Sequence, residues 1–490
     1  MERKTTLLPY QQKAYTQGFK YLINHKAFGA LYDMGTGKTI TALYLYEFLL
    51  STHGTTKCII ICPKTIMSTW VDQLKEHLGS DDYLLWKNNT SQRYMQELGF
   101  FIDKPGGVFI VNTEAFQTEN KLLDQVIRRI CVQKTLMVLD ESSFIKSPTA
   151  NRTRRLLSMA KLAEYRMILT GTEITKNVLD LYTQGEFLQE GYWGIKNFYA
   201  FRARYAIMAD IYGPGGRLIR NGKYVGAKDI EDLKTRLMRC CVRITKADAL
   251  PDLPPKRYQT IMLEMPATIR KIYDAMKHDM VAFYKDRELT VSNKAVLFGR
   301  FRQICGGIFP DPIGVSGLPS MCIDDNIKID VIKTELEDTD QQAIIWACYT
   351  DEIKALAHDL QCPAIYGDVV QADRDNILAA FKAGEFKTLV LNPGVAAFGL
   401  NLQYINLVYY YSNPLRADHR WQSEDRCHRV GTKSAVLYKD LIYKDSIDER
   451  VKKILDEKTK LREEFRDGGL NNTIESDIMQ LPKEQFYDLF

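Results

Sequence analysis

The chain has 490 residues, of which 45% are hydrophobic and 26% are charged, and its lysines and arginines exceed its acids by 66 − 61 = 5. This length predicts two or three domains, because a single hydrophobic core rarely grows beyond about 250–300 residues. The weakly basic balance excludes a protein that binds nucleic acid through net charge alone, so such binding needs a local basic surface.

The N-terminus lacks an apolar signal segment and no apolar run approaches the length of a membrane span, so secretion and membrane insertion are not expected. Ten cysteines are scattered without a C-x-x-C pair, which favours reduced, buried thiols over zinc or disulfides. We therefore expect a cytoplasmic protein (host-cell cytoplasm for a viral one), with a nuclear location left open. Neither zinc nor a membrane is expected among its partners.

The first strong signal is a glycine-rich loop between a strand and a helix. Residues 27–32 predict a short buried strand, 33–39 read Asp-Met-Gly-Thr-Gly-Lys-Thr, and 40–49 have helical apolar spacing. A polyphosphate such as that of ATP needs inward backbone N–H groups, a lysine for its β and γ oxygens, a hydroxyl for Mg²⁺ and a helix N-terminus. The candidate contacts are Gly35, Thr36, Gly37, Lys38 and Thr39, with Thr39 also a candidate Mg²⁺ ligand.

Two observations qualify this loop. Tyr32 stands where the strict phosphate-loop pattern has glycine, so a chance glycine-rich turn is the alternative. Upstream, Gln11 precedes the first expected helix and can read an adenine edge through its paired donor and acceptor, although alone it is an ordinary helix start.

Short apolar strands then alternate with helix-like segments. Strands are predicted at 58–62, 108–112, 135–139 and 166–170. This alternation predicts a parallel sheet with right-handed crossovers, in which ligands bind beyond the carboxyl ends of the strands. Residues 1–185 are therefore expected to form a first α/β domain.

Polar groups end two of these strands. Asp140 and Glu141 follow the strand at 135–139, where one acid can hold Mg²⁺ and the next can position and deprotonate the attacking water. A surface acidic pair is the alternative. The hydroxyls of 169–172 can hydrogen-bond these acids and sense the γ-phosphate, or they form a simple turn.

Residues 186–325 interrupt the pattern. Helices are expected at 229–246 and 266–289, with the stiff proline-rich segment 251–256 between them. Asn221-Gly222, between short arms at 217–220 and 223–226, predicts a two-residue β-hairpin turn. Residues 306–320 are rich in glycine and proline and are expected to form a loop.

The alternation returns in residues 326–460. Strands are predicted at 342–348, 363–366, 387–391, 406–411 and 435–442, with helices at 350–360 and 371–383. A capping box at 446–449 opens a charged helix that runs to about 466, and 461–490 is expected to be a C-terminal tail.

One helix of this second half carries aligned polar groups. Gln422, Arg426 and Arg429 share a helical face through their i, i+4, i+7 spacing. The two arginines could reach a γ-phosphate as fingers supplied in cis, and the alternative is an exposed basic helix. Gly399 is expected in a tight turn before a strand, although its segment is equally compatible with a plain loop.

In order, these motifs resemble those of superfamily 2 helicases, specifically the Snf2 group of DNA translocases, from about residue 7 to residue 458. The matching segments are 9–11, 33–39, 62–64, 112–114, 140–143, 169–172, 253–256, 301–305, 399–402 and 422–431. Residues 181–184 and the expected hairpin are most similar to the distant branch with annealing and fork-remodelling helicases. The compact size is also similar to phage-type branch-migration helicases.

The resemblance implies an α/β fold of two RecA-like parallel-sheet lobes, with a mainly helical insertion that carries a β-hairpin. It implies an ATP hydrolase that uses Mg²⁺, with Gln11, Gly399 and Gln422 at the nucleotide. It also implies a DNA partner, duplex or branched. The candidate DNA contacts are Lys64, Thr113, Lys146, Arg217, Arg220 and Lys223. The last three would make the hairpin a wedge at a DNA junction, and a solvated hairpin is the alternative.

The sequence departs from the Snf2 pattern at a few positions. Ser143 replaces the usual histidine, Glu173 replaces the usual proline, and 392–394 and 432–433 also differ. None of these changes removes a residue that hydrolysis needs. The rival functions are an RNA helicase of the same superfamily and a nucleotide-dependent switch or scaffold with slow ATPase activity. A nucleosome remodeller is disfavoured because no histone-reading domain is apparent.

Overall fold

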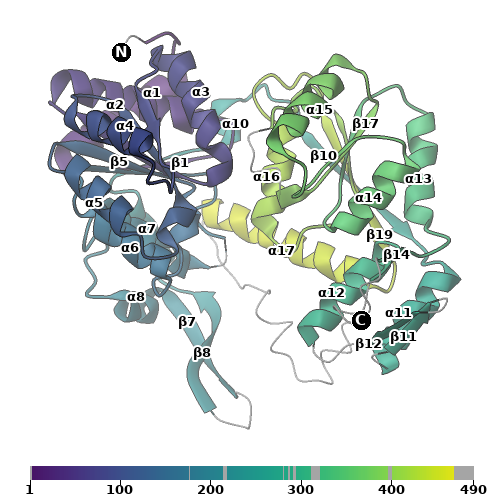
Figure 1. Cartoon of the computed structure of the whole chain (residues 1–490). Coiled ribbons are helices and arrows are strands. Elements are labelled where there is room, and N and C mark those ends of the chain that lie inside the picture. Colours follow the sequence, from purple (N-terminus) through teal and green to yellow (C-terminus); the bar gives the residue numbers. More distant parts are fainter. Residues whose placement is uncertain are drawn as a thin grey trace. The chain divides into compact units, whose positions relative to one another are not determined.

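The computed structural model describes residues 3–175, 177–212, 218–279, 281–284, 287–290, 294–310, 320–394 and 400–467 (Figure 1). Tertiary contacts divide the described chain into two compact units, one made of residues up to Pro251 together with 461–467, and the other of Asp252–Lys460. Each unit is built on its own parallel sheet, as the α/β prediction requires. Within the described ranges, none of the helices has the length and apolar character needed to cross a membrane.

The first unit holds a seven-stranded sheet in the order β3-β4-β2-β5-β6-β1-β9, and all its neighbouring strands are parallel. Its strands are β1 (Ala27–Tyr32), β2 (Lys57–Cys62), β3 (Tyr83–Leu85), β4 (Val108–Asn112), β5 (Thr135–Asp140), β6 (Tyr165–Thr170) and β9 (Cys241–Ile244). The five strands predicted in residues 1–185 are confirmed. The sequence reasoning missed β3 and β9.

Helices cover both faces of this sheet. One face carries α1 (Pro9–His25), α2 (Lys38–Thr52) and α3 (Met67–Leu78). The other carries α4 (Gln92–Asp103), α5 (Lys121–Ile130), α6 (Asn151–Ala160), α7 (Leu181–Leu188), α8 (Phe198–Tyr205) and α9 (Ile230–Leu237). Alternate residues of β1 therefore enter opposite cores, Phe28 and Ala30 the first and Ala27 and Leu31 the second. Burial on both faces explains why the strands are continuously apolar.

The expected helix at 229–246 is wrong beyond Leu237. The chain turns there, forms β9 as an edge strand beside β1, and continues into α10 (Lys246–Ala249). The absence of a side chain at Gly29 permits this pairing, because a Cβ atom there would lie only 2.3 Å from Cys241 Sγ. A pairing of this kind depends on a tertiary neighbour and not on local periodicity.

A β-hairpin is present, but the one predicted from the Asn-Gly pair is wrong, because residues 218–226 of its two arms and turn form a single strand. β7 (Ala206–Tyr212) pairs antiparallel with β8 (Leu218–Ala227), so Asn221 and Gly222 lie inside a strand. The register shifts at this point, since Ala209 pairs with Lys223 whereas Ile211 pairs with Ile219. The longer partner at 206–212 offers more pairing than the four-residue arm at 217–220, and the glycine is accommodated as an irregularity. The ribbon extends away from the first sheet (Figure 1).

The second unit holds a six-stranded parallel sheet in the order β10-β19-β18-β15-β17-β16. Its strands are β10 (Lys256–Leu263), β15 (Ala343–Trp346), β16 (Ala364–Ile365), β17 (Thr388–Leu391), β18 (Leu407–Tyr410) and β19 (Val436–Tyr443). The five strands expected after residue 326 are confirmed. β10 was not predicted, and it continues the proline-stiffened segment 251–256 as an eight-residue strand along β19.

Helices again cover both faces of the second sheet. One face carries α13 (Ile327–Glu337) and α14 (Thr350–Asp359), and the other carries α15 (Gln371–Ala383) and α16 (Ala417–Cys427). A separate core joins α11 (Ala267–Asp279), α12 (Lys294–Cys305) and α17 (Ile447–Asp467). The Ser446 hydroxyl caps α17 by accepting a hydrogen bond from Asp448 N at 3.2 Å.

Two further expectations in the middle of the chain change. The helix expected at 266–289 ends at Asp279, and β11 (Val281–Tyr284) and β12 (Arg287–Thr290) follow it as an antiparallel pair. The loop expected at 306–320 is wrong at its start, because β13 (Ile308–Phe309) lies within it and pairs with β14 (Met321–Cys322). Residues 311–319 lie outside the described residues. Residues 186–325, grouped above as one insertion, are divided at Asp252 between the two units.

Candidate functional site

The carboxyl edge of the first sheet gathers the predicted motifs of the first unit. Because the strands are parallel, their following loops meet at one edge. Leu31 pairs with Thr170 and Asp140 pairs with Leu169, so the loops after β1, β5 and β6 are neighbours. Cys62 pairs with Asn112, which places the loops after β2 and β4 side by side.

The glycine-rich loop has the backbone that an anion site requires. Gly35 and Gly37 have φ values of 79° and 94°, in the left-handed region that glycine adopts without strain. The Thr36 hydroxyl donates to Asp33 O at 2.8 Å, and α2 begins at Lys38, so its N-terminal N–H groups adjoin the loop. The Lys38 ammonium donates to Tyr32 O at 3.0 Å and to Asp33 O at 3.4 Å. These groups form a positively polarised cradle at the helix N-terminus.

Gln11 lies against this loop, as predicted for a nucleotide-site residue. Its Nε2 donates to Thr36 O at 3.4 Å and its Oε1 accepts from Leu8 N at 2.9 Å. A Cβ atom at Gly37 would lie 2.3 Å from the same Nε2, so the loop approaches this amide more closely than any larger residue allows. The amide thus ties the start of α1 to the phosphate loop.

The acidic pair at the end of β5 has two distinct environments. The Trp70 indole N–H donates to Asp140 Oδ2 at 2.9 Å, and Glu141 N donates to Oδ1 at 2.9 Å. Burial raises the pKa of Asp140, while the Lys38 ammonium and the Trp70 hydrogen bond act against that rise. Glu141 has a φ of 53°, a left-handed conformation that costs a non-glycine residue about 1–3 kcal/mol.

The loops after β2 and β4 share one carboxylate. Glu114 Oε2 accepts from Lys64 N at 3.3 Å and from the Thr113 hydroxyl at 3.3 Å. Lys64 is exposed, as a phosphate contact requires. Thr113 is 0% exposed, so its hydroxyl serves this internal bond and cannot be the predicted side-chain contact with DNA in this conformation. The half-buried Lys146 donates to the Thr175 hydroxyl at 2.7 Å.

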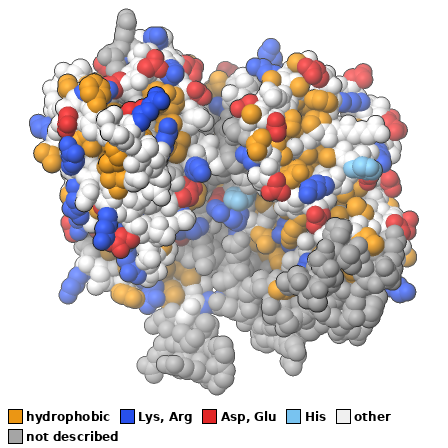
Figure 2. All heavy atoms as spheres, in the orientation of Figure 1, with side chains coloured by type: hydrophobic (Ala, Val, Ile, Leu, Met, Phe, Trp, Pro, Cys, Tyr) orange, Lys and Arg blue, Asp and Glu red, His pale blue; other side chains and the backbone are white. Residues whose placement is uncertain are grey.

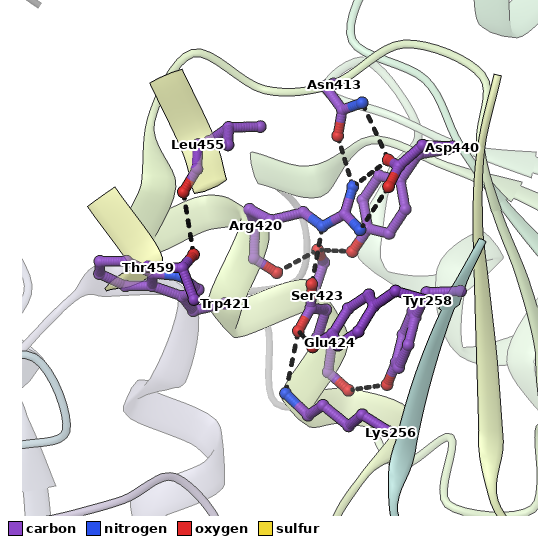
Figure 3. A network of polar contacts seen from close by, with 12 residues as sticks. Lys256, Tyr258, Asn413, Arg420, Trp421, Ser423, Glu424, Asp440, Leu455 and Thr459 are labelled. Carbon is purple, nitrogen blue, oxygen red and sulfur yellow. Dashed lines mark hydrogen bonds and ion pairs between the residues drawn. The ribbon is translucent and has the colours of Figure 1, made fainter. Parts of the chain in front are cut away.

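In the second unit, α16 is held by a buried network of charges (Figure 3). Arg420 pairs with Asp440 on β19 and with Glu424 one helical turn ahead. Lys256, at the start of β10, donates to Glu424 Oε2 at 2.9 Å and to Asp425 Oδ1 at 3.0 Å. Burial would raise the pKa of Glu424, but Lys256 and Arg420 lower it to about 2. Every charge in the network is paired, as burial demands.

The predicted polar residues lie on the other side of this helix. Gln422 and Arg426 are half-buried, whereas Arg420, Trp421 and Ser423 to Asp425 are buried. The helix ends at Cys427, so Arg429 belongs to the following turn and does not continue the helical face. Its backbone N donates to the Thr432 hydroxyl at 3.1 Å, and its guanidinium donates to Asn401 Oδ1. Gly399 lies outside the described residues.

Comparison with known protein families shows the family to which this chain belongs. Residues 19–306, more than half of the chain, match the SNF2-related domain, and residues 327–431 match the helicase conserved C-terminal domain. The chain belongs to the SNF2-related family of superfamily 2 ATP hydrolases. The predicted resemblance is therefore confirmed, and ATP is the nucleotide that this family uses.

Several SNF2-related proteins are similar over most of this chain. One is the TATA-binding protein-associated factor mot1 of Aspergillus fumigatus, 23% identical over 91% of this chain and 26% of that protein. A Caenorhabditis elegans homologue of the SWI/SNF-related matrix-associated actin-dependent regulator of chromatin subfamily A-like protein 1 is 24% identical over 90% of this chain and 59% of its own.

The putative ATP-dependent helicase/translocase YwqA of Bacillus subtilis is 22% identical over 99% of this chain and 51% of its length. The SNF2-related chain thus spans about a quarter to three fifths of these three relatives. The Sulfolobus solfataricus SWI2/SNF2 ATPase core in complex with dsDNA is a similar solved structure, with a TM-score of 0.43 and 20% identity, covering 100% of this chain and 97% of that one.

Sequence reasoning placed the SNF2-related motifs but missed the groups that hold them. Trp70 was not among the predicted site residues, whereas the structure makes it a hydrogen-bond donor to Asp140. A buried indole needs an acceptor, and that need is a usable signal. Glu114 and Gln184 lie in segments that resemble the family, but their hydrogen bonds were not predicted. Lys246, whose backbone N donates to Asp33 Oδ2 at 2.9 Å, carried no sequence signal.

A buried acid at the carboxyl edge of the second SNF2-related sheet gives a pH prediction. Glu352 Oε2 accepts from the Ser412 hydroxyl at 2.7 Å and from Cys348 N at 3.3 Å. Its side chain is fully buried, and burial raises its pKa from 4.5 to about 7. The folded protein thus binds this proton more tightly than the unfolded chain, so the stabilisation is complete below pH 4.5 and is lost as the pH rises through 7.

We expect the free energy of unfolding of the wild type, relative to Glu352→Gln, to rise by roughly 3 kcal/mol as the pH falls from 8 to 4.5. Glutamine mimics the neutral acid and should remove this dependence. Hydrogen exchange of the β15 and β18 amides across a urea series measures the difference. Parallel pH curves for the two proteins would contradict the assignment.

Proposed function

We propose that the chain is an ATP-dependent DNA translocase that remodels branched DNA by fork reversal, branch migration or unwinding. The observation that carries the proposal is the carboxyl edge of the first sheet. There a phosphate loop with two left-handed glycines, a lysine and a buried acid meet in an SNF2-related chain. Two relatives add support, because one is a putative ATP-dependent helicase/translocase and another is a homologue of a chromatin regulator.

In the proposed reaction, the loop N–H groups and Lys38 bind the phosphates of ATP. The Thr39 hydroxyl and the Asp140 carboxylate would hold Mg²⁺, which neutralises charge on the β and γ oxygens. The residues fit this ion, since Asp140 is a buried acid with a raised pKa that a cation would return to the ionised form. Trp70 fixes one oxygen of Asp140, and Glu141 orients the water and accepts its proton.

The second unit would supply positive charge that stabilises the transferring phosphoryl group in the transition state. Arg426 and Arg429 are the proposed fingers for the transferring phosphoryl group, and Gln422 lies at the nucleotide with them. The paired charges beneath α16 support this role, because they fix the helix that carries Gln422 and Arg426.

DNA would be held through its phosphates, which makes the contact salt-dependent and independent of sequence. Lys64 and Lys146 are the proposed contacts in the first unit, with Thr113 contributing backbone only. On the face drawn in Figure 2, basic side chains are interspersed with acidic ones, which fits local contacts better than a single basic field. Lys223, on β8, supports a hairpin that contacts a junction, while Arg217 and the Arg220 side chain lie outside the described residues.

The test compares ATP hydrolysis with single-stranded DNA, linear duplex, a fork, a Holliday junction, a nucleosome and RNA, at matched nucleotide concentration. We expect duplex or branched DNA to stimulate most, and stimulation to fall steeply with salt. Lys64→Ala should weaken stimulation without changing basal turnover, whereas Lys13→Ala, at an exposed lysine of α1, should behave as wild type. Stronger stimulation by RNA would assign an RNA helicase, and turnover indifferent to every polynucleotide would assign a switch or scaffold.

A further inference from the structure

One buried carboxamide joins the loop after β5 to the loop after β6. Gln184, on α7, is 1% exposed, and its Oε1 accepts from the Ser142 hydroxyl at 2.6 Å. Its Nε2 donates to Glu173 O at 2.7 Å and to Asp180 O at 2.8 Å. Both amide N–H groups and the amide oxygen are therefore used.

The orientation of this amide follows from its surroundings. Two carbonyl oxygens face Nε2, and a flipped amide would set its own oxygen against both of them. The hydroxyl of Ser142, which is fully buried, must then be the donor to Oε1. Only this orientation of the Gln184 amide satisfies all the hydrogen-bonding groups that join the two loops.

Thr183, next to Gln184 on α7, holds the other end of the short helical turn that begins at Ser142. The 3₁₀ helix η3 (Ser142–Ile145) begins directly after Glu141. The Thr183 hydroxyl donates to Ile145 O at 2.5 Å, so Thr183 and Gln184 together hold the last and the first residue of η3. The loop after β6 is anchored in turn, because Asp180 Oδ2 accepts from Thr175 N at 2.9 Å.

The hydrogen bonds of Gln184 to Ser142 and of Thr183 to Ile145, called the clamp below, hold a turn that directly follows a strained residue. Glu141 keeps its left-handed backbone at the N-terminal end of η3, and such a conformation persists only when its surroundings over-determine it. The Ser142–Gln184 bond is the first tertiary side-chain bond after Glu141 in the chain. Without it, the Glu141 backbone can relax and carry its carboxylate away from the water it must orient.

We infer that Gln184 is a positioning residue for Glu141, acting through Ser142 to hold the base and tying it to the loop that carries Glu173. The inference rests on the proposed role of Glu141 as the base, and not on DNA as the partner. Glu173 is itself held by an ion pair with Arg243 on β9, so the clamp extends from the base to the edge of the sheet.

Basal ATP hydrolysis by the full chain, without nucleic acid, tests this role. Gln184→Met keeps the side-chain length but removes all three hydrogen bonds, and Ser142→Ala removes one. We expect kcat to fall about 10-fold or more in each, with KM for ATP within about twofold, because displacement of a catalytic group by about 1 Å can cost about 10²-fold. The double variant should lose little more than Gln184→Met, since both changes break the same bond.

Tyr192→Phe is the matched control. It deletes a buried hydrogen bond of the same unit, from the Tyr192 hydroxyl to Leu237 O at 2.7 Å, which does not touch η3. If Gln184→Met lowers the unfolding midpoint as Tyr192→Phe does but leaves kcat and the acid limb of the pH–rate profile unchanged, the inference is wrong. Glu141→Gln, measured alongside, separates the two claims, since normal turnover in that variant refutes the base assignment itself.

Discussion

Glu141→Gln is expected to lower kcat for ATP by about 10²- to 10⁴-fold, the range that general base catalysis contributes. The amide has the shape of the carboxylate but cannot accept the proton of the attacking water. The backbone N–H of residue 141, which holds Asp140 Oδ1 at 2.9 Å, is untouched, so the proposed metal ligand should keep its geometry. Phosphate release under steady-state conditions measures the change.

Two controls show that the loss lies in the chemical step. Binding of a fluorescent ATP analogue and the thermal midpoint should both match the wild type in Glu141→Gln. Lys38→Ala should instead lose nucleotide binding together with turnover, because it removes the charge proposed to contact the phosphates and leaves Tyr32 O without its 3.0 Å donor. Wild-type turnover in Glu141→Gln would remove this residue from the role of base.

Arg429→Ala is expected to cut kcat by about 10³-fold or more, the magnitude seen when an arginine finger is lost. Arg429→Lys should not restore the rate, because an ammonium cannot reproduce the planar fork of the guanidinium. The matched variant is Asn401→Ala, which removes the partner of Arg429 in this structure but keeps the charge. We expect Asn401→Ala to retain most of the rate.

A rate unchanged by Arg429→Ala would exclude this residue from the site. Arg426→Ala tests the second candidate by the same assay. A defect in only one of the two variants would leave a single finger, and the position of Arg429 in the turn beyond α16 makes the two residues structurally inequivalent.

Most of the fold could be predicted because the strands of both sheets are buried on both faces and so read as continuous apolar runs. β9 and β10 were not predicted, for a different reason. Each is an edge strand whose partner is distant in the chain, and the four residues of 241–244 are too few for periodicity to distinguish a strand from a helix. The Asn-Gly pair was misleading because turn chemistry is local, whereas the length of the available partner strand is not.

The candidate site shows the same difference between local and tertiary signals. Residues that would touch nucleotide belong to contiguous motifs and were found, among them Lys38, Thr39 and Asp140. Residues that hold those motifs make single tertiary bonds, as Trp70 does to Asp140 and Gln184 to Ser142. No periodicity or spacing encodes such a bond. Burial of the Thr113 hydroxyl against Glu114 was equally invisible in the sequence.

The pairing of β10 with β19 also bears on how the protein is made. Lys256 pairs with Val436 in the sheet register, so the first strand of the second unit waits for a partner 436 − 256 = 180 residues further along. Until Glu424 and Asp425 emerge from the ribosome, the Lys256 ammonium lacks the carboxylates that make its burial tolerable. The second sheet can therefore form only after residues 424–443 have been synthesised, when all strands of the first sheet have already emerged. The glycine-rich loop at 33–39 is thus expected to form during synthesis before the segment that carries Arg426 and Arg429 can fold.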